Sequence, residues 1–214
     1  MLKYLAVAVF ILGAVLVTWM GSAFVGGNPL ALVVTTAIGL CYLAGVAELA
    51  RFYRDTGQLS ATLKTTGADG SDLEAWLAAL PESLRNPVRL RLQGGQGALP
   101  MPVLTPYLTG LLVMLGMLGT FVGMVATLQG AVTALEGTTE LDAIRNGLAA
   151  PIKGLGMAFG TSVAGVAASA ALGFISTLCR RDRLAAVRLL DSFIDGNFHR
   201  HSLPYLNQLL NYQY

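Results

Sequence analysis

In the middle of a long run without charged residues lies the stretch Leu115-Gly116-Met117-Leu118-Gly119-Thr120-Phe121-Val122-Gly123-Met124. It places three glycines and a threonine at helical spacing inside a segment that is apolar enough to enter a membrane. A second segment rich in small residues follows, from Ala158 to Ala170. A helix that faces only lipid does not need such residues, whereas a helix with close neighbours does. The two segments therefore indicate tight helix packing, and they raise the question of a polar path through the membrane.

Composition places the chain in a membrane. Its 214 residues are 54% hydrophobic and only 12% charged, whereas about a quarter of the residues in a typical soluble domain are charged. A hydrocarbon core needs about 20 apolar residues per helix. We predict an all-α polytopic membrane protein with four transmembrane helices, at Leu5–Val25, Leu30–Ala50, Pro106–Gly130 and Gly154–Cys179.

The distribution of charged residues predicts how the spans are oriented in the membrane, and together with the spans it divides the chain into four segments. Arginines gather between the second and third spans and after the fourth, which places those regions and both termini in the cytoplasm. The loops at 21–29 and 131–150 then face the other side. The segments are a transmembrane pair at 1–50, a cytoplasmic helical segment at 51–103, a second transmembrane pair at 104–180 and a cytoplasmic helical extension at 181–214.

The cytoplasmic segment at 51–103 has its own pattern. Apolar residues recur at helical spacing from Leu73 to Leu84, which predicts short amphipathic helices. No stop signal marks the end of the chain at Tyr214, so the sequence leaves open whether the natural protein continues.

Small and hydroxyl residues form one stripe on each of the last two spans. The stripes consist of Gly116, Thr120, Gly123 and Thr127 on the third span and of Ala158, Ser162, Gly165, Ser169 and Gly173 on the fourth. Small residues let membrane helices approach closely and small hydroxyls bond across them, so one interpretation is packing within a bundle. The other is that Thr120 and Ser162 face a polar path, because a hydroxyl group can both donate and accept a hydrogen bond.

Ionisable residues are absent from both stripes. No Asp, Glu, Lys, Arg or His occurs between Pro106 and Gly130 or between Gly154 and Cys179. Ion pathways in membranes usually need such a group, so a conducting protein of this kind would need a partner chain that supplies it. The one acid inside an apolar run is Glu48, which we interpret as an interfacial carboxylate. No phosphate-binding loop, metal-ligand spacing or nucleophile–base pair is visible, so we expect no enzyme, cofactor or metal.

The stretch at 115–124 resembles the G-L-x-G-T-x-x-G-[IM] helix of the MotA/TolQ/ExbB proton channel family. The element Ser162-Val163-Ala164-Gly165 is similar to a [TS]-x-x-G element in that family's last span, and Ile144, Gly147 and Leu148 resemble the approach to it. The spacing from Gly147 to Ser162 is about two turns longer than is typical of ExbB or TolQ, which leaves Thr161 and Ser162 as alternatives. The family's spacing to Gly165 favours Ser162.

The resemblance covers about residues 105–180 of the sequence, and the four spans equal the number in MotA. The sequences at 104–112 and 151–162 resemble those of one branch of the family. Members of this branch have a long cytoplasmic tail, and they include proteins similar to the Zorya anti-phage membrane subunit.

The resemblance implies a ring in the bacterial inner membrane. A homopentamer of this chain would surround a dimer of a single-span MotB/ExbD/TolR-like protein that carries a membrane aspartate. Transported protons or sodium ions would drive rotation, with Thr120 and Ser162, or Thr161, on the ion path. The residues expected to line the pore or pack it closely are Gly116, Gly119, Gly123, Thr127, Gly165 and Ser169. The spans within 1–50 would form the outer ring facing the lipid bilayer, and no nucleic acid is expected as a direct partner.

Two other functions are compatible with a membrane protein of this kind. One is a structural membrane scaffold that recruits partners through its cytoplasmic tail. The other is a small secondary transporter, although the sequence shows neither an inverted repeat of broken helices nor an internal charged site.

Overall fold

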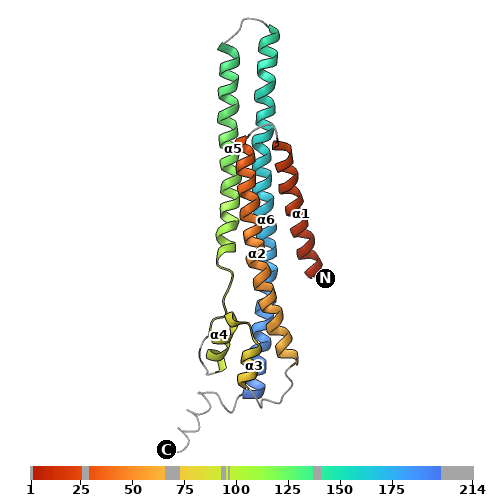
Figure 1. The fold of residues 1–214 in the computed structure, drawn as a ribbon, viewed down its shortest axis with the longest axis vertical. Coiled ribbons are helices and arrows are strands. Elements are labelled where there is room, and N and C mark those ends of the chain that lie inside the picture. Colours follow the sequence, from red (N-terminus) through yellow and green to blue (C-terminus); the bar gives the residue numbers. More distant parts are fainter. Residues whose placement is uncertain are drawn as a thin grey trace, which may run out of the picture. The chain divides into compact units, whose positions relative to one another are not determined.

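The computed structural model describes residues 2–25, 29–65, 73–92, 95, 97–136 and 141–198. Within these residues it contains helices and no strand (Figure 1). The helices are α1 (Leu2–Phe24), α2 (Pro29–Thr65), α3 (Leu73–Ala79), α4 (Glu82–Leu92), α5 (Leu104–Glu136) and α6 (Leu141–Phe198). The all-α fold class is thereby confirmed. Of the extension predicted at 181–214, residues 181–198 belong to α6, and residues 199–214 lie outside the described residues.

Four of these helices are long and apolar enough to cross a membrane. Their candidate spans are Tyr4–Phe24, Pro29–Leu63, Leu104–Val132 and Ala158–Ile194. Each predicted transmembrane helix therefore corresponds to a different helix of the structure, α1, α2, α5 and α6. Large apolar side chains cover much of their surface, such as Leu12, Met114 and Phe159, each at least 60% exposed. Surfaces of this kind are stable in lipid and unfavourable in water.

The helices extend further than the sequence predicts. Helix α2 continues past the predicted end at Ala50 to Thr65, because the chain between them contains no proline and a single glycine, Gly57. Helix α6 begins at Leu141 and runs through Pro151, which costs a backbone hydrogen bond without ending the helix. The predicted loop at 131–150 is correspondingly helical at 131–136 and 141–150.

The chain divides into two compact units, which we describe separately. Unit 1 consists of residues 1–48 and 103–176, and unit 2 consists of residues 49–102 and 177–214. Helices α1 and α5, residues 29–48 of α2 and residues 141–176 of α6 thus belong to unit 1. Helices α3 and α4 belong to unit 2, together with residues 49–65 of α2 and residues 177–198 of α6.

In unit 1, α1 and α2 are joined by an aromatic contact. The Tyr42 hydroxyl donates a hydrogen bond to the carbonyl oxygen of Phe10 over 3.1 Å, and the two rings stack with centroids 6.1 Å apart. Gly13 makes room for this tyrosine, since a Cβ atom there would lie 2.5 Å from its hydroxyl oxygen. Gly45 does the same for Leu172 of α6, which would lie 2.6 Å from an added Cβ.

Glu48 holds the first turn of α5. Its Oε1 accepts hydrogen bonds from the backbone N–H groups of Val103 and Leu104, over 3.0 and 2.9 Å. Its Oε2 accepts one from the buried Thr105 hydroxyl over 2.6 Å. The first N–H groups of a helix have no partner within the helix, and a carboxylate there also interacts favourably with the helix dipole. Glu48 is therefore an N-terminal cap supplied by α2, a role beyond that of the interfacial carboxylate expected from sequence.

An apolar core forms in unit 2 between the short helices and the ends of the long ones. It contains Leu59 of α2, Trp76 and Leu77 of α3, Leu80, Leu84, Val88 and Leu92 around α4, Leu99, and Ala186 and Leu190 of α6. Trp76 stacks on Phe193 with ring centroids 5.6 Å apart. The predicted amphipathic helices are thus present, and their apolar faces cover α2 and α6 within this unit.

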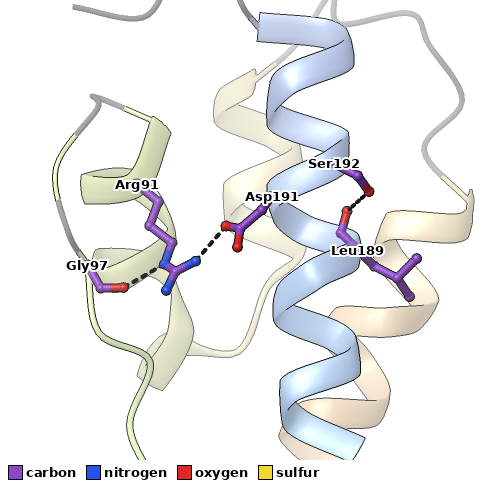
Figure 2. Close-up of polar contacts among 5 residues, drawn as sticks. All are labelled: Arg91, Gly97, Leu189, Asp191 and Ser192. Atoms are coloured by element: carbon purple, nitrogen blue, oxygen red, sulfur yellow. Dashed lines mark hydrogen bonds and ion pairs between the residues drawn. The ribbon is translucent and has the colours of Figure 1, made fainter. Parts of the chain in front are cut away.

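The segment after α4 is tied back by one arginine, as Figure 2 shows. Arg91 donates from Nε to the carbonyl oxygen of Gly97 over 2.7 Å and from Nη1 to Asp191 of α6 over 2.5 Å. Gly97 is required here, since a Cβ atom would collide with the carbonyl oxygen of Pro87. Next to this contact, the Ser192 hydroxyl donates to the carbonyl oxygen of Leu189 over 2.9 Å.

Removing the Glu48 cap should destabilise unit 1. Glu48→Ala removes all three acceptor contacts, and loss of a helix cap typically costs about 0.5–2 kcal/mol. Thr105→Val keeps the two backbone contacts and nearly the same shape, so its thermal unfolding in detergent should fall between that of Glu48→Ala and that of the unmodified chain. If Glu48→Ala unfolds at the same temperature as the unmodified chain, the cap contributes nothing.

Candidate functional site

The small-residue stripes meet between α5 and α6, which run side by side in Figure 1. The closest approach is at Gly116 and Gly165. A Cβ atom built on Gly165 would lie 2.6 Å from the carbonyl oxygen of Leu112 and 2.8 Å from the Cα of Gly116. A Cβ atom built on Gly116 would lie 3.2 Å from the Cα of Gly165 and 3.3 Å from that of Ser162. The two backbones are therefore in direct contact, without side chains between them.

Two further glycines on the same face of α5, Gly119 and Gly123, also pack against α6. A Cβ atom on Gly119 would lie 2.5 Å from the Thr161 hydroxyl oxygen and 3.0 Å from Val34 of α2. One on Gly123 would lie 2.5 Å from the Cβ of Ala158. Residues 116, 119 and 123 are spaced by three and four, so they form one ridge of the helix. Gly119 rather than Thr120 thus shares the α6-facing ridge with Gly116 and Gly123.

Thr161 is fully enclosed in this contact. Its side chain is 0% exposed, and its hydroxyl donates to the carbonyl oxygen of Ala158 one turn earlier over 2.8 Å. The hydroxyl is therefore satisfied within its own helix, and it fills the space that Gly119 leaves open. This position suits packing and offers no access to an incoming group in the described chain.

Thr120 and Thr127 lie beside the glycine ridge of α5. Both are half-buried, and their hydroxyls donate to the carbonyl oxygens of Met117 and Met124 over 2.6 and 2.8 Å. The residues around Thr120 are among the most exposed of the helix, with Met117 at 62% and Phe121 at 65%. Thr120 is therefore placed where a helix outside this chain can reach it.

Ser162 and Ser169 lie on the opposite helix. Ser162 is half-buried, and its backbone rather than its side chain forms the contact with Gly116. Ser169 is also half-buried and donates its hydroxyl hydrogen to the carbonyl oxygen of Thr109 on α5 over 2.8 Å. Ser169 therefore joins the two helices directly, as a packing hydroxyl does.

The structure thus brings seven of the nine predicted positions to the α5–α6 contact and leaves two beside it. Those at the contact are Gly116, Gly119, Gly123, Thr161, Ser162, Gly165 and Ser169, and those beside it are Thr120 and Thr127. Whether any of them lines an ion path stays a prediction. Ile144, Gly147 and Leu148 are on α6, but their side chains lie outside the described part of the chain.

No metal site competes with this interpretation in the residues that the structure describes. No group of three or more His, Cys, Asp or Glu side chains there could hold a metal ion. Glu48, the one acid inside an apolar run of the sequence, has both carboxylate oxygens engaged at the start of α5.

Sequence reasoning missed a buried arginine in unit 2. Arg183 of α6 is 2% exposed, and its guanidinium carbon lies 4.2 Å from the ring centroid of Phe52 of α2. The sequence predicts a charged cytoplasmic helix after the fourth span. Within it, however, Cys179, Arg183, Ala186 and Leu190 share one helical face. That spacing, with three apolar neighbours around one arginine, is the signal that could have found it.

Comparisons with known proteins identify no family for this chain. No protein-family model matches it, and no curated protein or solved structure is significantly similar to it. The resemblance to the MotA/TolQ/ExbB family therefore rests on the motifs in the sequence.

Substitution of the contact glycines should separate α5 from α6. Gly165→Ala and Gly123→Ala force the helices apart, since the added Cβ atoms would lie 2.6 Å from the carbonyl oxygen of Leu112 and 2.5 Å from the Cβ of Ala158. Overpacking of this kind typically costs about 1–3 kcal/mol. Gly110→Ala is the matched control on α5, because nothing lies within 4 Å of a Cβ atom there. In detergent, thermal unfolding should occur at lower temperature for the first two variants and at an equal or slightly higher temperature for the control. Equal unfolding temperatures for all three would contradict the close contact.

Proposed function

We propose that this chain is the membrane subunit of a rotary motor driven by an ion gradient. Five copies surround a dimer of a single-span partner that carries a membrane aspartate, and proton or sodium flow at the interface turns the ring. The chain itself is not an enzyme. The observation that carries the proposal is the α5–α6 pair. Its backbones are in contact through glycines, half-buried hydroxyls lie beside them, and neither apolar run contains Asp, Glu, Lys, Arg or His.

The charge distribution supports a partner as the source of the titrating group. Ion movement through a membrane interior requires a group that stabilises the ion there. The apolar runs of α5 and α6 contain no such group, and Glu48 is occupied as a helix cap. A carboxylate on a second chain would supply the charge, and the hydroxyls of Thr120 and Ser162 would orient it or accept its proton.

The helix surfaces support assembly around such a partner. Helix α5 presents Met114, Met117, Phe121 and Leu128, each more than 60% exposed. In a ring, part of this surface would contact neighbouring copies and part the central dimer, while α1 and α2 would face lipid. A membrane potential of 100 mV supplies about 2.3 kcal/mol for each charge moved, which is enough to bias a rotational step.

The decisive experiment compares hydroxyl variants in vesicles that hold this chain with and without the aspartate-bearing partner. Thr120→Ala and Ser162→Ala should reduce ion flux, followed with a pH-sensitive or sodium-sensitive dye, to the level without partner. Both variants should still form the pentamer, because their hydroxyls do not hold α5 against α6.

Thr36→Ala is the matched control for this experiment. Thr36 is exposed on α2, and its hydroxyl donates to its own helix, at Leu32, over 2.7 Å. It should leave flux unchanged. Loss of the pentamer in the Thr120 and Ser162 variants would instead identify these residues as packing groups of a membrane scaffold. Flux without any partner would indicate a transporter.

A further inference from the structure

Unit 2 contains a buried arginine, Arg183, whose guanidinium group lacks some of its hydrogen-bond acceptors. The Nε and Nη1 atoms of Arg183 are buried and have no hydrogen-bond partner, and the guanidinium group lies over the Phe52 ring. Burying an arginine without a full set of acceptors is costly, so such a group calls for a source of negative charge.

The two stretches of sequence around Phe52 and Arg183 contain more arginines than acidic residues. Residues 51–55 read Arg-Phe-Tyr-Arg-Asp and residues 180–183 read Arg-Arg-Asp-Arg, so five arginines face two aspartates, a local excess of three positive charges. The contact between Phe52 and Arg183 brings these two stretches of α2 and α6 together. Arg51, Arg54, Arg180 and Arg181 are all exposed.

The excess of three positive charges already includes the two aspartates. Asp55 attracts Arg183 electrostatically, and its Oδ2 also accepts a hydrogen bond from the Ser83 hydroxyl of α4 over 2.9 Å. Asp182 is one charge between three arginines. An anion from outside the chain is therefore attracted to this surface.

The position of the arginines along the helices selects the anion. No charged residue occurs in α2 between Pro29 and Ala47 or in α6 between Gly154 and Cys179. Runs of this length cover the hydrocarbon core, so the first arginines beyond them lie at the depth of the lipid headgroups. The planar guanidinium group bonds two phosphate oxygens at once, which suits a phospholipid phosphate.

We propose that the exposed Arg51, Arg54, Arg180 and Arg181 bind the phosphate groups of anionic phospholipids. The bound phosphates lower the electrostatic cost of the buried Arg183, so anionic lipid stabilises unit 2. This inference requires only that the chain spans a membrane, and it is independent of motor activity.

The test measures thermal unfolding of the purified chain in a zwitterionic detergent. Phosphatidylglycerol, added in increasing amounts, should raise the unfolding temperature, and native mass spectrometry should detect bound lipid. Phosphatidylcholine and inorganic phosphate at equal concentration should have no effect. An equal effect of phosphatidylcholine would show that charge is irrelevant, and an equal effect of free phosphate would show that the surface binds phosphate without lipid. Either result overturns the proposal.

Variants locate the effect on the protein. Arg180→Gln with Arg181→Gln should weaken phosphatidylglycerol binding roughly fivefold per arginine. Arg188→Gln, an exposed position two turns further along α6, should leave it unchanged. Unaltered binding in the double variant, or equal weakening by Arg188→Gln, would overturn the assignment.

Arg183→Met separates a lipid-coupled role from a merely structural one. Without the buried charge, the chain should unfold in phosphatidylcholine at the same or a higher temperature, because removing an incompletely paired ion can be neutral or stabilising. The increase caused by phosphatidylglycerol should shrink. A variant that unfolds earlier and keeps the full increase would show that Arg183 stabilises unit 2 on its own and would contradict the proposal.

Discussion

Helices α5 and α6 touch backbone to backbone at Gly116 and Gly165, because neither residue carries a side chain. In a membrane, water does not drive helices together, so packing contacts and interhelical hydrogen bonds must hold them. The glycines let the two backbones approach closely, which brings the side chains around them into packing contact as well. This contact fixes the rotation of α5, and that rotation decides which residues face α6 and which remain beside it.

The sequence predicted the parts of this arrangement that depend on local pattern. Long apolar runs require helices in a membrane, since every backbone group must be bonded within its own segment. The four spans were therefore correctly assigned to four helices. The small residues at 116, 123 and 165 also indicated close packing. Helix ends were harder to predict from sequence. The apolar run of α2 ends at the first charged residues, whereas the helix continues to Thr65.

Polar contacts between distant parts of the chain could not be predicted in this way. Glu48 and Thr105 are far apart in sequence, and only the folded structure places the carboxylate at the start of α5. The burial of Arg183 likewise depends on Phe52 of another helix. The stripe that we assigned as Gly116, Thr120, Gly123 and Thr127 was also imprecise, because Gly119 lies on the α6-facing ridge and Thr120 beside it. Thr120 and Gly119 both lie at a helical spacing of three or four residues from Gly116 and Gly123. The sequence alone therefore does not show which of the two faces α6.

The same geometry distinguishes the two hydroxyls that the spacing of the motif left as alternatives. An incoming carboxyl group from another chain can exchange a proton only with a hydroxyl that it can approach. Thr161 is enclosed by Gly119 and bonded to Ala158, so access would require α5 and α6 to separate. Ser162 is half-buried, and its atoms nearest to the Cβ position of Gly116 belong to its backbone. In the proposed motor, we therefore expect Ser162 and Thr120, rather than Thr161, to accept the proton, and Thr161 to pack against Gly119.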